Sequence, residues 1–413
     1  MKYEWVVVGG GVAGIALSEI LTREGHNVLL IDKGEQLAGE TTKIFHEWIH
    51  TGSLYTLIPD KLTTLKFLLG AIDDLLEYYS CFERMNLRPT ESGLAIDGSS
   101  GWFSPNYIMF KYRRRKLNLP WSLGTARSSY LINKIREHDW LRRRGGVVDE
   151  FKDGMYRSIL KTYKEIMKEK GKFYDVETPD FTTNSRHILR DLIATAINNN
   201  LELSLDNPVL KIENHNGQKV VVTEKSTIKA SNVIICAGKN ISDFMDVGVK
   251  TSIAPIAVVT GLDKDAKSFV ELDYIVKNCI NLVTKPGGVG LIGGISLNSE
   301  EKAQEYLAYV IDQHKKLNKD IKVIDTYFGY KNEIVFKDQN RNYLFHIVPT
   351  GEGIWAVVPG KFTLGFSLAA EFYRRVYKRN PRKVFSTVTD TGNHAGYVSD
   401  TLWYDLVNQK GGE

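Results

Sequence analysis

The sequence predicts an α/β fold in which a parallel sheet is interleaved along the chain with a second, β-rich α+β region. Two observations lead to this prediction. The first 32 residues read as strand, glycine turn, helix and strand, which is the order of a βαβ unit. Apolar strands that end in small residues or glycine turns then recur in the middle of the chain and near its end. Parts of one sheet are therefore expected to come from separated segments.

The N-terminal unit has the pattern of a nucleotide-binding turn. Residues 5–8 form an apolar, β-branched strand, and apolar residues at helical spacing follow the glycines. Gly9 permits the sharp exit from the strand, Gly11 allows close approach of a diphosphate, and Gly14 lets the helix lie against the sheet. The free N–H groups at the helix N-terminus favour that anion. The predicted cofactor residues of this turn are Gly9, Gly11, Val12, Ala13 and Gly14.

The second strand, residues 27–31, ends at Asp32, which lies 18 residues after Gly14. A carboxylate at this point bonds a ribose hydroxyl and repels a 2′-phosphate. The polar loop that follows has hydroxyls and amides that can close over the diphosphate from the other side. It adds Lys33, Thr41 and Thr42 to the predicted cofactor residues. Together these features predict a Rossmann-like domain that binds a dinucleotide.

The rest of the chain divides into helices and short strands. Apolar periodicity predicts helices over residues 63–79, 128–141, 154–170, 185–199, 300–318 and 366–377. Strands are predicted at residues 201–205, 207–212, 219–223, 227–229, 232–236, 253–260, 280–296 with a turn at Gly287 and Gly288, 343–348 and 354–358. We assign residues 1–80, 176–250 and 345–413 to the cofactor domain and residues 81–175 and 251–344 to the substrate domain.

Composition excludes several classes of protein. At 413 residues the chain has room for two domains, and its apolar stretches are interrupted by charge before they reach a membrane-spanning length. The N-terminal apolar run belongs to the nucleotide unit, so we do not read it as a signal peptide. Three cysteines without a CxxC pair favour a reducing, cytoplasmic compartment and argue against a metal site or a disulfide framework. The net charge of +5 implies no nucleic-acid partner by itself.

Three later blocks extend the N-terminal pattern. Residues 49–52, Ile-His-Thr-Gly, are followed by Tyr55; residues 232–236 form a buried-type strand that runs into Ala237 and Gly238; and residues 359–363, Pro-Gly-Lys-Phe-Thr, open the last helix. With these blocks the chain resembles the FAD-dependent family of D-amino-acid oxidase, sarcosine oxidase, L-2-hydroxyglutarate dehydrogenase and glycerol-3-phosphate dehydrogenase. The resemblance covers most of the chain in order and is weakest between about residues 80 and 175.

The resemblance implies FAD as cofactor and adds residues to its site. Val209 would meet the adenine through its backbone, and Ala237 and Gly238 would lie beside the nucleotide. A positive helix end near the flavin pyrimidine edge stabilises the negative charge of the reduced ring. The start of the last helix is assigned to this position, with Gly360, Lys361, Phe362 and Thr363.

Three residues are predicted to act on the substrate. His50 suits a general base or a flavin contact, and it equally suits a structural histidine. Arg341 and Tyr343 precede the C-terminal block, where relatives often hold a substrate carboxylate, and the guanidinium fork binds carboxylates in a bidentate manner. A surface arginine is the alternative for Arg341. Lesser candidates are His46, Tyr330 and His346.

The predicted function is oxidation of a C–N or C–O bond in a small anionic substrate by hydride transfer to flavin N5, with the electron acceptor unassigned. Residues 290–293 lack the lysine that promotes oxygen reaction in sarcosine-oxidase-like proteins, which favours a dehydrogenase. Two alternatives remain open. The basic clusters at 113–116 and 142–144 fit a large acidic substrate, carrier-bound or RNA-linked, or a membrane surface. The missing lysine also fits a flavin-binding protein without turnover.

Overall fold

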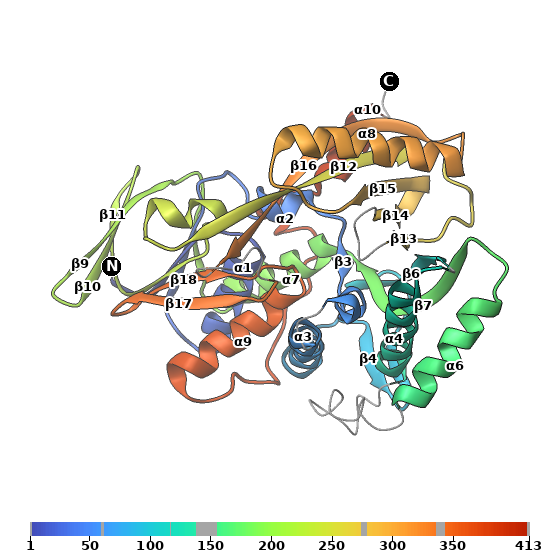
Figure 1. The fold of residues 1–413 in the computed structure, drawn as a ribbon. Coiled ribbons are helices and arrows are strands. Elements are labelled where there is room, and N and C mark those ends of the chain that lie inside the picture. The colour runs from blue at the N-terminus through green and yellow to red at the C-terminus, as the bar shows by residue number, and fades with distance from the viewer. Residues whose placement is uncertain are drawn as a thin grey trace.

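The computed structural model describes residues 2–58, 62–115, 117–137, 155–273, 279–335 and 343–410. In this part of the chain two eight-stranded sheets lie next to each other, and helices pack against both of them (Figure 1). A separate hairpin joins β4 (Leu87–Thr90) and β5 (Gly93–Ile96). The chain passes between the two sheets several times, as the alternation of strand signals in the sequence predicts.

The first sheet has the strand order β17-β18-β11-β1-β2-β8, and the meander of β9 and β10 extends from β11. Its central strands are parallel, so their carboxyl ends meet at one edge. The bounds are β1 (Lys2–Val8), β2 (Val28–Ile31), β8 (Glu202–Ser204), β9 (Val209–His215), β10 (Gln218–Thr223), β11 (Thr227–Ile235), β17 (His346–Gly351) and β18 (Ile354–Val358).

Helices cover one face of this sheet. They are α1 (Val12–Arg23), α3 (Thr63–Tyr79), α7 (Ser185–Asn198) and α9 (Leu364–Tyr377). Val7 of β1 packs among these helices, whereas its neighbours Val6 and Val8 pack on the opposite face under the meander. Both faces of β1 are thus buried, which explains why its sequence is a continuous apolar run without alternation.

The second sheet has the order β16-β12-β15-β14-β13-β6-β7-β3. Helix α8 packs on β12 and β15, while α4 and α6 pack together beside β7 (Figure 1). The bounds are β3 (Trp48–Ile49), β6 (Phe103–Arg113), β7 (Phe173–Thr183), β12 (Val249–Thr260), β13 (Phe269–Leu272), β14 (Ile280–Lys285), β15 (Val289–Gly294), β16 (Lys322–Ile334), α4 (Leu119–Arg136), α6 (Met155–Lys168) and α8 (Glu300–Leu317).

Several predicted boundaries differ from the structure for local reasons. Helix α4 begins nine residues before the predicted start at residue 128, since Asn118 caps it by accepting from Trp121 N–H and Pro120 suits its first turn. The strands predicted at 227–229 and 232–236 form one strand, β11, in which the Asn232 side chain donates to the Glu4 carbonyl. Strand β17 starts at His346, so Tyr343 lies before it.

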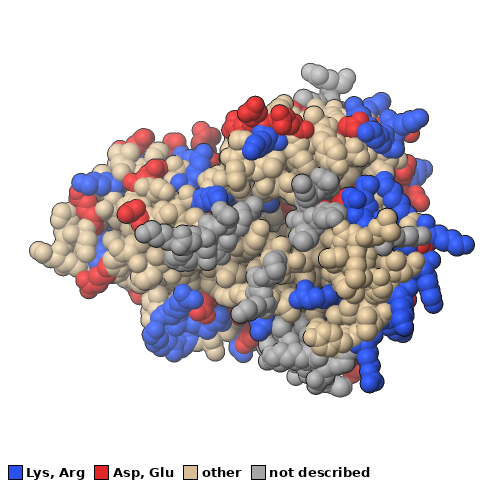
Figure 2. Space-filling model, in the orientation of Figure 1, with Lys and Arg blue, Asp and Glu red and all other residues tan. Residues whose placement is uncertain are grey.

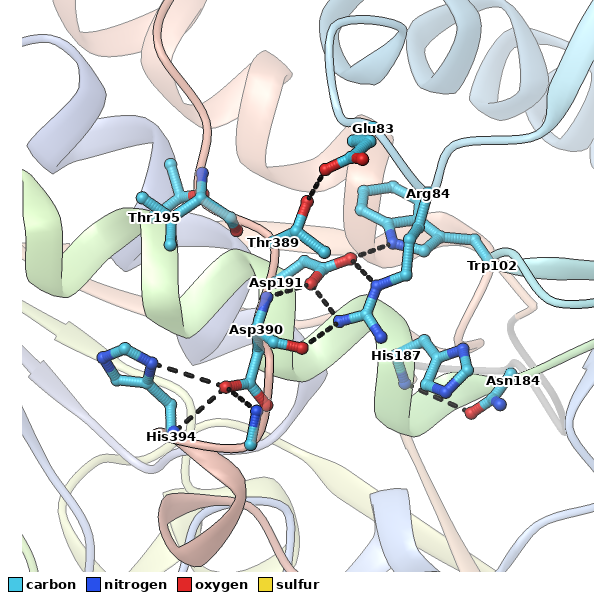
Figure 3. A network of polar contacts seen from close by, with 12 residues as sticks. Glu83, Arg84, Trp102, Asn184, His187, Asp191, Thr195, Thr389, Asp390 and His394 are labelled. Carbon is cyan, nitrogen blue, oxygen red and sulfur yellow. Dashed lines mark hydrogen bonds and ion pairs between the residues drawn. The ribbon is translucent and has the colours of Figure 1, made fainter.

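A buried polar network fastens the segment after α9 to α7 (Figure 3). The Asp191 carboxylate, on α7, forms an ion pair with Arg84 and accepts hydrogen bonds from Trp102 Nε1 at 2.7 Å and from the Asp390 backbone at 2.9 Å. Arg84 also donates to the Asp390 carbonyl. Further along, Tyr397 and Ser399 form backbone hydrogen bonds with Leu37. Helix α10 (Leu402–Lys410) follows and packs near β16.

Replacement of Asp191 by alanine should lower the free energy of unfolding by about 3–5 kcal/mol, because Arg84 is left with an uncompensated, mostly buried charge. Chemical denaturation measures this change. Arg88→Ala is the matched control, since its ion pair with Asp97 is exposed and should contribute about 1 kcal/mol or less. Equal losses in the two variants would contradict a stabilising role for the Asp191 network.

Candidate cofactor and active site

The glycine turn after β1 is packed too tightly for larger residues at two positions. Gly9 has φ +100°, donates to the Ile31 carbonyl at 2.8 Å, and a Cβ there would lie 2.7 Å from the Cys236 carbonyl oxygen. A Cβ on Gly14 would lie 1.9 Å from the Gly9 carbonyl oxygen. The glycines therefore set the close contact between the strand ends and the first turn of α1.

Gly11 differs from these glycines, since it is open on the outer side of the turn. A Cβ on Gly11 would have only one non-neighbouring atom within 4 Å, Thr42 Oγ1 at 3.3 Å. Gly11 is the N-cap of α1 and has no side chain to cap the helix, and the first turn holds no acidic residue. By their position in the first turn, the N–H groups of Ala13 and Gly14 have no acceptor within the helix. The turn fits an anionic group such as the diphosphate of FAD.

Asp32 lies beside this turn at the end of β2. One carboxylate oxygen accepts from Gly10 N–H at 2.6 Å and the other from Gly34 N–H at 2.8 Å. The carboxylate thus fixes the loop and stands at the edge where the predicted ribose contact would form. Lys33, by contrast, makes an exposed ion pair with Glu40.

The two threonines predicted for the loop face different partners. Thr42 Oγ1 accepts from Val12 N–H at 3.2 Å, so this hydroxyl lies at the N-terminus of α1. Thr41 Oγ1 donates to the Tyr330 carbonyl on β16 and so links the loop to the second sheet.

The middle block lies at the same edge of the first sheet. Val209 begins β9 and is partly buried against the core beneath the meander. Ala237 and Gly238 follow β11, the parallel neighbour of β1, and Gly238 has φ +56°. A Cβ on Gly238 would lie 3.3 Å from Asn332 Nδ2 of β16, so the end of β11 faces the second sheet.

The C-terminal block brings the start of α9 to the segment that follows β3. Gly360 has φ +66°, and a Cβ there would lie 2.8 Å from the Leu344 carbonyl oxygen. Thr363 is buried at the N-cap of α9, and its hydroxyl accepts from His50 N–H at 3.1 Å. Phe362 packs against Phe366 in the core. Residues 313 positions apart are thereby joined by one hydrogen bond.

Lys361 and two tyrosines lie next to the contact between His50 and Thr363. Lys361 Nζ lies 4.9 Å from the centre of the Tyr55 ring and 5.1 Å from that of Tyr343, and the two rings are 5.4 Å apart. The His50 ring stands edge-on to Tyr55 at 6.3 Å. The structure therefore brings together His50, Tyr343, Lys361 and Thr363, which the sequence singled out separately.

The sequence missed Asp180, a fully buried carboxylate on β7. Its Oδ1 accepts from Thr51 N–H, from the Thr51 hydroxyl at 2.5 Å and from the Ser53 hydroxyl at 2.7 Å. Its Oδ2 accepts from Trp48 Nε1 at 3.1 Å and lies 3.6 Å from His50 Nδ1, which is an ion-pair distance. Asp180 falls in a strand that the sequence did not predict, so no local pattern marked it.

The surroundings of His50 favour the neutral imidazole. Its Nδ1 is buried beside Asp180 and its ring packs on Trp48 with centroids 4.2 Å apart, while one fifth of the side chain stays exposed. Burial lowers the pKa of His50 below 6.5, Lys361 and Lys331 lower it further, and Asp180 partly offsets these effects.

The lesser candidates lie in different surroundings. Burial, together with the nearby Lys331 and Lys285, lowers the pKa of His46 to about 3. Tyr330 donates its hydroxyl to Glu300 at the surface. Burial lowers the pKa of His346 at the start of β17. Arg341 lies outside the described residues.

The first basic cluster is largely paired within the protein. Lys and Arg side chains gather at the edge that carries α6, on the right of Figure 2. Arg113 forms an ion pair with Glu271 at 2.5 Å, and Arg115 contacts both oxygens of Asp273. Arg114 donates to carbonyls in and after α6. These contacts give the three arginines a structural role, and residues 142–144 lie outside the described part.

The described residues show neither a metal-binding cluster nor a membrane-spanning helix. In these ranges no group of three or more His, Cys, Asp or Glu side chains is arranged to hold a metal ion. Over the same ranges, no helix is both long enough and apolar enough to cross a membrane.

The parallel sheet, the glycine turn and the acid after β2 define a nucleotide-cofactor protein. A family model described as FAD dependent oxidoreductase matches residues 4–267, and the chain belongs to this family. FAD is its cofactor, and the open turn at Gly11 fits the diphosphate of that molecule.

Solved structures share the fold over nearly their whole length. L-α-glycerophosphate oxidase from Mycoplasma pneumoniae, a structure with FAD bound, is 16% identical with a TM-score of 0.62, covering 97% of this chain and 99% of that one. L-proline dehydrogenase from P. horikoshii is 13% identical with a TM-score of 0.62, covering 100% and 99%. Glycine oxidase from Bacillus cereus is 13% identical with a TM-score of 0.61, covering 95% and 99%.

One curated relative is similar over a shorter stretch. UDP-galactopyranose mutase from Mycoplasma pneumoniae is 40% identical over 150 residues, which span 33% of this chain and 31% of the mutase. The chain thus matches about a third of that protein.

Proposed function

We propose that this FAD-dependent oxidoreductase oxidises a C–N or C–O bond of a small anionic substrate such as an amino acid, an amine or a 2-hydroxy acid. One observation carries the proposal: the His50 imidazole, backed by the buried Asp180 carboxylate, stands beside Lys361 and Tyr343 at the start of α9. A base (His50), a cation (Lys361) and an aromatic ring (Tyr343) therefore lie close together.

Each residue in this cluster has a role that its surroundings support. With Asp180 facing Nδ1, the ring carries its proton there and presents the Nε2 lone pair, which takes the proton from the substrate hydroxyl or amine. Lys361 and Lys331 supply positive charge near His50, which suits an anionic substrate. Bound FAD supplies the acceptor, flavin N5, for the hydride from the substrate carbon. Arg341 remains a prediction from the sequence for the substrate carboxylate.

Anaerobic reduction of the bound FAD by a panel of amino acids, amines and 2-hydroxy acids tests this proposal. At least one member is expected to bleach the visible absorbance of the oxidised flavin, and an uncharged amide or ester of the same compound should do so far less well. Failure of the whole panel, with FAD present at one per chain, would favour a flavin-binding protein without turnover or a large substrate.

The pH dependence of flavin reduction should reflect the environment of His50. Because burial and two lysines lower its pKa, the base stays neutral below its ordinary value of 6.5. The rate is therefore expected to hold as pH falls through 6.5 and to decline only at lower pH, where Nε2 becomes protonated. Stopped-flow reduction against pH measures this. A decline centred at or above 6.5 would argue against His50 as the base.

A further inference from the structure

Arg186 is a buried cation for which the site has given no role. It lies in the first turn of α7 with 5% of its surface exposed. Its Nη2 donates to the Thr42 carbonyl at 3.2 Å, whereas Nε and Nη1 are buried and have no hydrogen-bond partner among the described residues. Buried donors without partners are costly, and a buried charge more so. An anion bound next to Arg186 would accept hydrogen bonds from these donors and balance the buried charge.

The neighbouring carboxylates do not supply that anion, because other groups hold them. Lys285 pairs with Glu47 at 2.8 Å, and the same carboxylate accepts from Ser185 and Trp403. Two further acids near Arg186 are held in the same way, by the ion pairs Arg190–Asp400 at 2.8 Å and Lys43–Asp405 at 2.7 Å. Burial lowers the pKa of Arg186 to about 10, with Glu47 and Asp400 opposing and Arg190 reinforcing that effect.

Thr42 connects Arg186 to the phosphate-binding turn. Its carbonyl accepts from the Arg186 guanidinium, and its hydroxyl accepts from Val12 N–H at the start of α1. A Cβ on Gly11 would face the same hydroxyl. Helix α7 precedes β8, which runs parallel to β2, so its N-terminus lies at the edge where the parallel strands end. Two positive elements, the α1 N-terminus and Arg186, thus flank one threonine.

We propose that Arg186 is a binding residue for the diphosphate of FAD and supplies the counter-charge that the glycine turn lacks. The planar guanidinium can present two N–H groups to phosphate oxygens, which a lysine cannot reproduce. This role concerns retention of the cofactor and goes beyond the proposed function, because it holds whatever the substrate is.

The test uses the full-length apoprotein of the variant Arg186→Met, which keeps an unbranched side chain of about the length of the arginine stem and removes the guanidinium charge. The dissociation constant of FAD, measured by quenching of flavin fluorescence, is expected to rise about 10- to 100-fold. The melting temperature of the apoprotein should stay equal or rise, since an unpaired buried charge has been removed. Arg190→Met is the control: it leaves Asp400 unpaired, so it should lower the melting temperature and leave FAD affinity unchanged.

These two readouts separate a binding role from a structural one. Unchanged FAD affinity in Arg186→Met, or a fall in apoprotein melting temperature like that of Arg190→Met, would overturn the proposal. Should Arg186→Met not fold, Arg186→Lys decides: it keeps the charge and loses the fork, so weaker FAD binding supports the proposal and unchanged binding overturns it. No substrate is needed, so failure here is distinguishable from failure of the proposed oxidation.

Discussion

A Gly11→Val variant is expected to fold and to bind no FAD. The apoprotein tolerates the new side chain because a Cβ meets only the Thr42 hydroxyl, at 3.3 Å. The same side chain fills the side of the turn from which the diphosphate must reach the α1 N-terminus. Extraction of the purified variant, followed by mass measurement of the released nucleotide, decides the result. Retention of one FAD per chain would show that the phosphate turn is assigned wrongly.

Two further variants calibrate this result. Gly70→Ala in α3 places a Cβ where nothing lies within 4 Å, so FAD content should stay at the level of the unmodified protein. Asp32→Ala should weaken FAD binding less than Gly11→Val, because it removes the bonds to Gly10 and Gly34 and the predicted ribose contact, and leaves the phosphate side of the turn open.

Substitution of His50 by asparagine should slow flavin reduction about 10²- to 10⁴-fold, the usual contribution of a positioned general base. FAD content should not change, since the contact of this residue with the start of α9 is through its backbone N–H. Rapid-mixing measurements with the best substrate of the panel give the rate. His215→Gln is the control, because His215 is an exposed residue of β9 whose side chain contacts Glu213, and its replacement should leave the rate unchanged. Equal rates for His50→Asn and the unmodified protein would show that His50 is a structural residue and not the base.

Asp180→Asn should reproduce much of the His50 effect without removing the imidazole. The amide oxygen can still accept from Thr51 and Ser53, while the amide nitrogen faces His50 Nδ1 and favours the other tautomer. Nitrogen-15 NMR of labelled histidine should find Nδ1 protonated in the unmodified protein and Nε2 protonated in the variant. An unchanged tautomer would contradict the positioning role of Asp180.

The parts of the fold that local pattern determines were predictable. The leucine spacing predicts both ends of α3 (Thr63–Tyr79), and the apolar run predicts both ends of β18 (Ile354–Val358). The glycine turn needs Gly9 and Gly14 for contacts that any βαβ unit of this kind makes. These features depend on neighbours in sequence or on a recurring motif, so the sequence alone carries them.

Long-range electrostatics was not predictable in the same way. Asp180 and Arg186 are single charged residues in segments without a motif, and their importance comes from burial beside residues more than a hundred positions away. A buried charge leaves no local periodicity. Conversely, the sequence around Arg113 and Arg115 suggests a basic surface patch. In the structure these arginines form ion pairs with Glu271 and Asp273, which lie on or next to β13. Their charge alone does not define a docking surface.

We propose that the substrate is oxidised in the cluster of His50, Asp180 and Lys361. A single anaerobic turnover with excess enzyme, followed by mass analysis of the product, tests it most directly. We expect a keto or imino product that has lost two hydrogen atoms, formed in an amount equal to the FAD reduced, and much slower product formation with His50→Asn. A product that is an isomer of the substrate, with no net reduction of FAD, would contradict it and point to chemistry without net oxidation.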